Sequence, residues 1–101
     1  MATTSKTLFR GAATTTTTTT LYTVPASTTT VVTSIVVTNT AGASGTFTLY
    51  LDGVILANTI TIGANDSTVI DMKQVLAATK TIQGGASATT INFHISGVEI
   101  A

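Results

Sequence analysis

The chain has no cysteine and no tryptophan, and it has one proline and one histidine in 101 residues. The absence of cysteine excludes disulfides, thiolate nucleophiles and zinc-thiolate sites, so stability must come from packing and from hydrogen bonds between strands. Only 8% of the residues are charged, against roughly 25% in an average soluble domain. Because the formal net charge is zero, no net field attracts nucleic acid or an anionic membrane, and neither is an expected partner.

Acidic, basic and histidine side chains are missing altogether from the 41 consecutive residues Gly11 to Leu51. This run contains the seven-threonine tract Thr14 to Thr20, and threonine accounts for 26 of the 101 residues. Threonine, valine and isoleucine are stiff at χ1 and fit a pleated strand better than a helix. We therefore expect a β-structured building block and not an enzyme. The low net charge also leaves little repulsion between copies and favours association.

Alternation of apolar and polar residues marks several strands. Residues 46–51 and 91–96 alternate strictly, which is typical of strands with one buried face. Between Thr29 and Thr40 both sets of alternate residues are partly apolar, which predicts a strand covered on both sides. At Gly97 the apolar positions change parity, which predicts a β-bulge at this glycine.

The dipeptide Asp52-Gly53 predicts a type I′ hairpin, because both central residues of that turn need positive φ. This turn would pair Leu51 with Val54 and Leu49 with Leu56.

Two further segments carry local signals of a different kind. Met72 to Ala78 holds the best cluster of helix formers and predicts a turn or a short 3₁₀ segment. Gly84-Gly85 predicts a turn before the last strand, which we expect over Ala88 to Ile100.

The spacing of strands and turns predicts an all-β fold, an antiparallel β-sandwich of about seven or eight short strands with jelly-roll or Ig-like topology. A closed barrel is the alternative. We expect one sandwich domain over residues 14–101, preceded at residues 1–13 by an N-terminal arm or a first edge strand. As an arm, this segment would pair with a neighbour's sheet edge, with Leu8 and Phe9 as anchors. We expect no export signal and no membrane-spanning segment.

His94 is the one candidate for acid–base chemistry, because Ser96 lies on the same strand face. A nucleophile needs its base within hydrogen-bond reach and an acid behind that base, and Glu99 lies beyond the expected bulge. We therefore interpret His94 as part of an outward strand face or a subunit contact.

A calcium site is one interpretation of Asp52, Asp66 and Asp71, because calcium binds several carboxylate oxygens. The sequence lacks the closely spaced acidic loop that such a site requires. Turn roles explain Asp52 and Asp66. The triplet Asn65-Asp66-Ser67 matches the glycosylation pattern, which we interpret as a turn. The sequence thus predicts no catalytic, cofactor-binding or metal-binding residues.

Four phrases of the sequence carry a resemblance to a known class of proteins. They are Leu21 to Ala26, Ser34 to Thr40, Thr46 to Leu49 before Asp52-Gly53, and Ile95 to Ile100. Together they resemble the small β-sandwich virion proteins of tailed bacteriophages. The resemblance implies a structural protein present in many copies on the particle, such as a capsid cement or decoration protein, or a tail or baseplate component. It supplies no catalytic residues.

The same resemblance implies partners and a location. The expected partners are further copies of the chain, forming a trimer by analogy, and another virion protein such as the major capsid protein. The expected location is the virion, assembled in the cytoplasm of the host bacterium.

Two other functions start from different features. Thr-x-Thr triplets begin at residues 38, 46, 59 and 79 and suggest an ice-binding surface, but their spacings of 8, 13 and 20 residues have no fixed period. A carbohydrate-binding or adhesin module would need an aromatic platform, for which Tyr22 and Tyr50 are the candidates. For both tyrosines we favour strand-surface packing, with the hydroxyl in water.

Overall fold

The computed structural model describes residues 2–101, which form eight β-strands and no helix. The strands are β1 (Thr3–Ala12), β2 (Thr20–Thr23), β3 (Thr29–Asn39), β4 (Gly45–Leu51), β5 (Val54–Ile62), β6 (Ser67–Leu76), β7 (Thr81–Ala86) and β8 (Ile91–Ile100).

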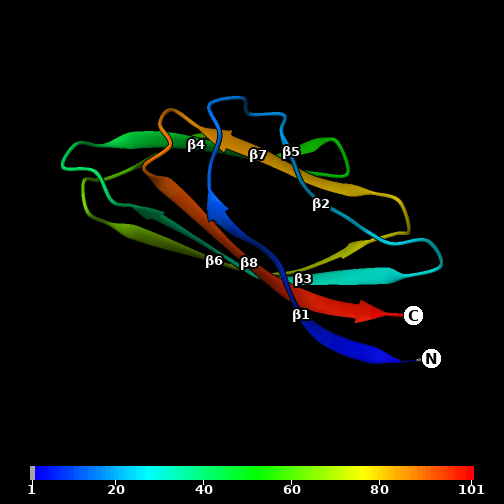
Figure 1. The fold of residues 1–101 in the computed structure, drawn as a ribbon. Helices are drawn as coiled ribbons and strands as arrows, with labels where there is room; N and C mark the ends of the chain where they lie inside the picture. The colour runs from blue at the N-terminus through cyan, green and yellow to red at the C-terminus, as the bar shows by residue number, and fades with distance from the viewer. Residues whose placement is uncertain (1) are drawn as a thin grey trace.

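The strands form two four-stranded antiparallel sheets that face each other (Figure 1). The strand order is β1-β8-β3-β6 in the first sheet and β2-β7-β4-β5 in the second. The chain changes sheet at every connection except the β4–β5 hairpin, and this strand order is that of an eight-stranded jelly roll. The prediction of an all-β sandwich is confirmed, and the closed-barrel alternative is wrong. The ends of the chain lie side by side, where Ala2 and Ala101 exchange backbone hydrogen bonds of 2.7 and 2.9 Å (Figure 1).

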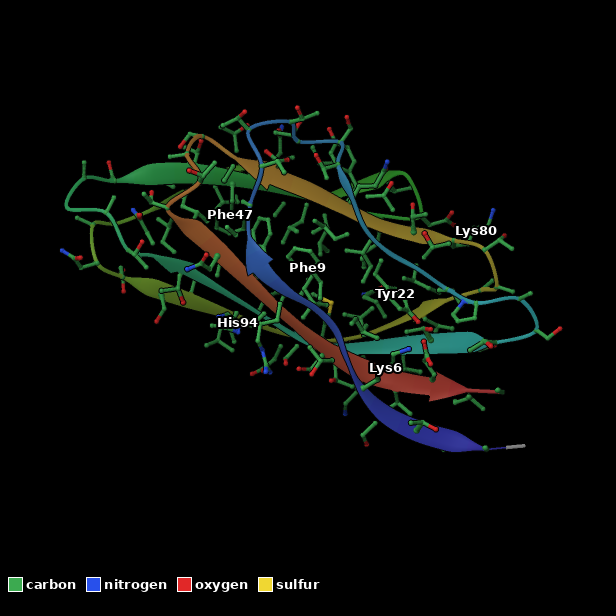
Figure 2. All side chains as sticks on the ribbon, in the orientation of Figure 1. Lys6, Phe9, Tyr22, Phe47, Lys80 and His94 are labelled. Atoms are coloured by element: carbon green, nitrogen blue, oxygen red, sulfur yellow. The ribbon has the colours of Figure 1, made fainter. Side chains whose placement is uncertain are left out.

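Apolar side chains from both sheets fill the space between them (Figure 2). Phe47 of β4 and Phe93 of β8 meet edge to face across this space, with ring centroids 6.3 Å apart. The remaining large side chains that are almost fully buried are aliphatic apart from one asparagine: Ile35, Leu49, Ile62, Ile82, Ile91, Ile95, Val24, Val32, Val37 and Asn39. Asn39 is tolerated there because its amide donates to the carbonyl of Ala43 at 2.8 Å and its oxygen accepts from the Ala41 amide.

β3 changes which side of the strand faces the core at Thr33. Its register against β8 shifts between Val32 and Ser34, so Val32 and Ile35 are both buried although they are three residues apart. The prediction that β3 is covered on both faces was therefore wrong. The apolar residues on both sets of alternate positions reflect one buried face interrupted by a bulge, which moves the alternation by one residue.

β8 itself has no bulge at Gly97, contrary to the sequence prediction. The register shifts lie on its two neighbours, between Thr7 and Phe9 of β1 and between Val32 and Ser34 of β3. A β-carbon at Gly97 would lie 2.9 Å from the Leu8 side chain and closer still to the Val31 carbonyl. Because Gly97 has no side chain, the bulged strands β1 and β3 can both approach it closely, and β8 keeps its regular alternation.

The helix-former cluster lies in a strand, because β6 continues to Leu76. Val75 pairs with Val31, and Leu76 pairs with Thr30 and is buried. A seven-residue helical preference is too weak to outweigh sheet pairing and the burial of Leu76. The predicted turn or 3₁₀ segment over Met72 to Ala78 was therefore wrong, and the turn follows β6.

Gly84 and Gly85 lie within β7, where a turn was predicted. The threonine tract lies against this strand and explains both glycines. The amide of Ala86 donates to the carbonyl of Thr14 at 2.9 Å, and the amide of Gly84 donates to the carbonyl of Thr19 at 2.9 Å. A β-carbon on Gly85 would lie 2.7 Å from the backbone carbon of Thr16, so the tract can approach only a glycine.

Hydroxyl groups of the tract hold its own backbone in place. The hydroxyls of Thr14 and Thr19 form a hydrogen bond of 2.6 Å with each other, and they lie 3.1 and 2.8 Å from the carbonyl oxygen of Thr16, which accepts from the hydroxyl whose proton is free. Gln83 donates to the carbonyl of Thr18 at 3.1 Å. Residues 14–19 are therefore an ordered loop that covers the edge of β7 beyond the short strand β2.

The hairpin at Asp52-Gly53 was predicted in part. Both residues have positive φ, of 54° and 72°, and Leu51 pairs with Val54 as expected. Leu49 pairs with Ala57 and not with Leu56, because the register shifts between Leu49 and Tyr50. A second shift lies between Phe47 and Leu49, where the amide of Thr59 donates to the Thr48 hydroxyl at 3.1 Å.

We predict that Gly85→Ala destabilises the fold, because the added methyl group collides with backbone atoms of the threonine tract. The free energy of unfolding, measured in urea, should fall by about 1–3 kcal/mol. Gly42→Ala is the control, because a β-carbon there meets nothing within 4 Å. Equal stabilities for the two variants would mean that the tract does not lie on β7.

Candidate interaction surface

The residues considered for chemistry do not converge. His94 lies on the outer face of β8, opposite Arg10 of β1 and Val36 of β3, and it points away from the core (Figure 2). Within residues 2–101, no three histidine or acidic side chains are grouped closely enough to hold a metal ion. The same residues include no helix with the length and apolar character needed to cross a membrane.

The three aspartates occupy separate elements. Asp52 is in the β4–β5 turn, where its carboxylate lies 3.8 Å from the Lys80 amine. Asp66 accepts a hydrogen bond of 2.8 Å from the amide of Ser67, as a turn residue does. Asp71 lies in the middle of β6.

A polar cluster that the sequence did not reveal joins the two sheets at their β1–β2 side. Tyr22 of β2 is only 9% exposed, and its hydroxyl donates a short hydrogen bond to the carboxylate of Glu99 on β8. The same hydroxyl lies 2.9 Å from that of Thr30 on β3. The amine of Lys6 on β1 lies 3.4 Å from the Glu99 carboxylate. The Tyr22 hydroxyl is therefore inside the sandwich, not in water as predicted, and its ring is not free to stack on a sugar.

This cluster shifts two pKa values in opposite directions. Burial, and the hydrogen bond to Glu99, raise the pKa of Tyr22 from its ordinary 10.0 to about 12. The hydrogen bond from Tyr22, with that from Lys6, lowers the pKa of Glu99. Folding therefore favours the neutral phenol of Tyr22 and the ionised carboxylate of Glu99.

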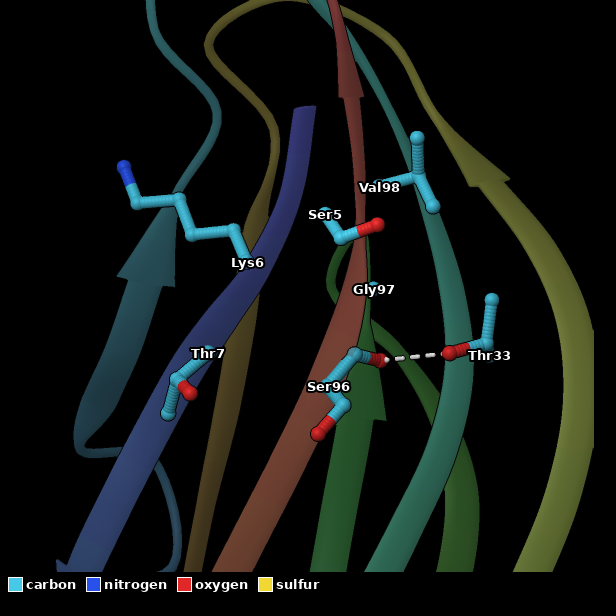
Figure 3. A pocket seen from close by; sticks show the side chains of 7 residues that line it. All are labelled: Ser5, Lys6, Thr7, Thr33, Ser96, Gly97 and Val98. Atoms are coloured by element: carbon cyan, nitrogen blue, oxygen red, sulfur yellow. Dashed lines mark hydrogen bonds between the residues drawn. The ribbon is translucent and has the colours of Figure 1, made fainter. Parts of the chain in front are cut away.

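The outer face of the first sheet is hollowed where the bulges of β1 and β3 flank Gly97 (Figure 3). This shallow hollow has a volume of about 390 Å³. Thr33 spans part of it by donating to the carbonyl of Ser96 at 3.1 Å, while the Lys6 side chain extends away from both residues (Figure 3). Its lining is mostly hydroxyl groups and backbone: Ser5, Lys6, Thr7, Thr33, Ser96, Gly97 and Val98.

Exposed apolar side chains are concentrated at the opposite side of the sandwich. β5 and β6 are the edge strands there, one in each sheet, and the turn at residues 63–66 joins them. Among residues 2–101, the six large exposed apolar side chains are all on these two strands: Val54, Ile55, Leu56 and Ile60 on β5, and Val69 and Val75 on β6. We call this surface the β5–β6 side. Exposed apolar side chains that gather in this way are typical of surfaces that contact other proteins.

β5 is the less protected of these two edges in composition. It carries no charged residue over its nine positions, and its exposed end reads Val54-Ile55-Leu56. Such segments are prone to pair with other chains unless they are bulged or covered. Its two register shifts and the positive φ of 51° at Thr59 interrupt its edge, which limits uncontrolled addition of strands.

Comparisons with known proteins do not identify a family for this chain. No protein-family model and no curated protein matches this chain. Over 99% of its length, the chain is similar to a solved structure described as "Crystal structure of Agl-KA catalytic domain", of which it covers 27%. The sequence identity is 15% and the TM-score is 0.42. A similarity of this size carries no argument about function.

We predict that the Tyr22–Glu99 pair makes stability depend on pH at both extremes. Because the pKa of Tyr22 is raised on folding, its contribution is complete below pH 10 and is lost as the pH rises toward 12. Because the pKa of Glu99 is lowered, its contribution is present above the ordinary 4.5 and is lost as the pH falls through the folded-state value. Urea unfolding across this pH range measures both effects.

Tyr22→Phe should remove the alkaline dependence, reduce the acid dependence and lower the free energy of unfolding at neutral pH by about 1–2 kcal/mol. Tyr50→Phe, on β4, is the matched control and should keep the alkaline dependence. An unchanged alkaline profile in Tyr22→Phe would contradict the assignment.

Proposed function

We propose that this protein is a non-enzymatic structural protein of a tailed bacteriophage particle, and that it acts as a capsid cement or decoration protein. The sequence resemblance supports the class of protein. The observation that carries the proposal is that the large exposed apolar side chains of residues 2–101 all lie on the β5–β6 side. A surface of this kind is suited to burial against other subunits.

The proposed mechanism is the removal of apolar area from water at contacts with other virion proteins. Each Å² of apolar surface buried contributes roughly 25 cal/mol, less the cost of ordering the partners. Since β5 has no charged side chain, no unpaired charge has to be desolvated when it is covered. We propose that β5 contacts another virion protein, such as the major capsid protein, and that many copies together stabilise the particle.

The alternatives considered from the sequence have less geometric support. The Thr-x-Thr triplets are spread over β3, β4, β5 and the turn before β7, and the Thr48 side chain is buried. Of the two candidate sugar platforms, only Tyr50 lies on an outer face, opposite Gln83 and Ile55. A tail or baseplate component would use the same β5–β6 side, and it differs from a capsid protein only in where on the particle the protein is bound.

We predict that antibodies against the purified protein label tailed particles produced by cells that carry this sequence. Immunogold labelling over the head supports a cement or decoration protein, whereas labelling over the tail supports the alternative. A protein that is found only in the unsedimented fraction, and never on particles, would contradict both.

The contribution of β5 is tested by adding the purified variant Ile55→Lys to particles that lack the protein. The buried lysine should weaken binding on the order of tenfold or more. Thr7→Lys places the same charge on the exposed β1 edge, at the other side of the sandwich, and should bind as the unmodified protein does. Equal binding by both variants would remove β5 from the attachment surface.

A further inference from the structure

The sandwich has four strand edges, and they differ in length, charge and regularity. β2 has only four residues. β1 carries Lys6 and Arg10 and no acidic residue, so antiparallel pairing of two β1 strands would bring positive charges together. β5 is interrupted by two register shifts. β6 is ten residues long, has one register shift where Met72 and Lys73 together oppose Thr33 of β3, and carries one acidic and one basic residue, Asp71 and Lys73.

The side chains of β6 alternate between the two faces of the first sheet. Val69, Asp71 and Val75 lie opposite Val36, Ser34 and Val31, which are on the outer face of β3. Lys73 lines one hollow with Asp71 and Thr33 and so lies on the same face as Asp71, while Ile70 and Met72 pack against the core. The outward residues therefore read valine, aspartate, lysine, valine, with Met72 at the centre of the series.

When two such strands run antiparallel, this order can place aspartate opposite lysine and valine opposite valine. We propose that the free edge of β6 pairs antiparallel with β6 of a second copy of this chain, with a two-fold axis passing between the two Met72 residues. Asp71 then lies opposite Lys73 of the second copy, and Lys73 lies opposite its Asp71. Val69 lies opposite Val75 of the second copy, and this contact is also made twice. The two first sheets join into one sheet of eight strands.

The charges select this register among the alternatives. Residues directly opposite each other in antiparallel strands lie on the same face, so the neighbouring two-fold registers place the axis at Asp71 or at Lys73. The first sets Asp71 against Asp71, and the second sets Lys73 against Lys73. Both put like charges face to face, which is destabilising.

The structure of the single chain supports this use of the edge. The ion pairs within residues 2–101 are Lys6–Glu99 and Lys80–Asp52, so Asp71 and Lys73 are in neither. Val69 and Val75 are 61% and 66% exposed, and pairing covers both. The inference goes beyond the proposed function, because it follows from β6 alone. It is also distinct from the trimer implied by the sequence resemblance, since a two-fold contact joins copies in pairs.

Charge reversal tests the proposal by light scattering and analytical ultracentrifugation over a range of protein concentrations. Asp71→Lys and Lys73→Asp each create two like-charge contacts and should raise the Kd of the pair on the order of tenfold or more. The double variant Asp71→Lys/Lys73→Asp restores both attractions and should associate like the unmodified protein. Arg10→Asp, which makes the same charge change as Lys73→Asp on β1, is the matched control and should not alter association.

Far-UV circular dichroism and urea unfolding of each variant show whether a loss of association reflects a loss of the fold. Failure of the double variant to recover association while it stays folded would overturn the proposal. A monomer at all concentrations, or a trimer without higher even-numbered species, would overturn it too. The trimer would leave the proposed function intact, whereas particle labelling tests that function independently of β6.

Cysteine pairs test the register itself, because the chain has no cysteine of its own. A mixture of Val69→Cys and Val75→Cys chains should form a disulfide-linked dimer under mild oxidation, since opposite Cα atoms in such a pair are about 4.5–5.5 Å apart. Either variant alone should not, because the two identical positions are roughly 20 Å apart along the strands. Mixed Val69→Cys and Lys73→Cys chains are the control for a shifted register. Equal cross-linking in the control mixture would overturn the assigned register.

Discussion

The core between the two sheets depends on the register shift at Thr33 of β3, the strand that lies between β8 and β6. Without the extra residue, strict alternation from Val32 would turn Ile35 and Val37 outward and bring Ser34 and Val36 into the core. The shift lets Val32, Ile35 and Val37 all face the core that also holds Phe47 and Phe93. The hollow on the outer face lies at the same shift, since Thr33 and Gly97 both line it.

The sequence alone was sufficient for the fold class and for the strands whose alternation is uninterrupted. β4 and β8 were predicted from apolar residues at every second position, and Asp52-Gly53 predicted the turn after β4. Bulges were harder, because a bulge in β3 and a strand with two apolar faces give the same residue pattern. The glycine at position 97 did indicate a bulge nearby. The bulges lie on the neighbouring strands β1 and β3, and not on β8 itself.

Contacts between distant segments account for the rest of what sequence reasoning missed. Helix propensity at Met72 to Leu76 is a local signal, and pairing with β3 outweighs it. Gly84 and Gly85 looked like a turn because nothing in their neighbourhood reveals that Thr14 to Thr19 lies against them. Glu99 was placed beyond a supposed bulge, yet it keeps the inward parity of Ile95 and Gly97, and that parity is what brings it to Tyr22.

The two sides of the sandwich differ in the interactions that their side chains make. At the β1–β2 side, the Tyr22–Glu99–Lys6 cluster connects β2 of one sheet to β8 and β1 of the other, so charge and hydrogen bonding are satisfied within the chain. At the β5–β6 side, exposed valine, isoleucine and leucine lie on edges without an intramolecular strand partner. This asymmetry gives a small domain of zero net charge a defined orientation for contacts, because one side is satisfied within the chain and the other side is available to other subunits.

The threonine tract has a further consequence for how this sequence can vary. Its two ends are fixed to β7 by the carbonyls of Thr14 and Thr19, while most of the residues between them are interchangeable because all are threonine. If the tract shifted by one residue against β7, threonine would still occupy the contact positions. Only the number of residues left to span the rest of the loop would change. In this segment the number of residues, more than their identity, carries the structural information.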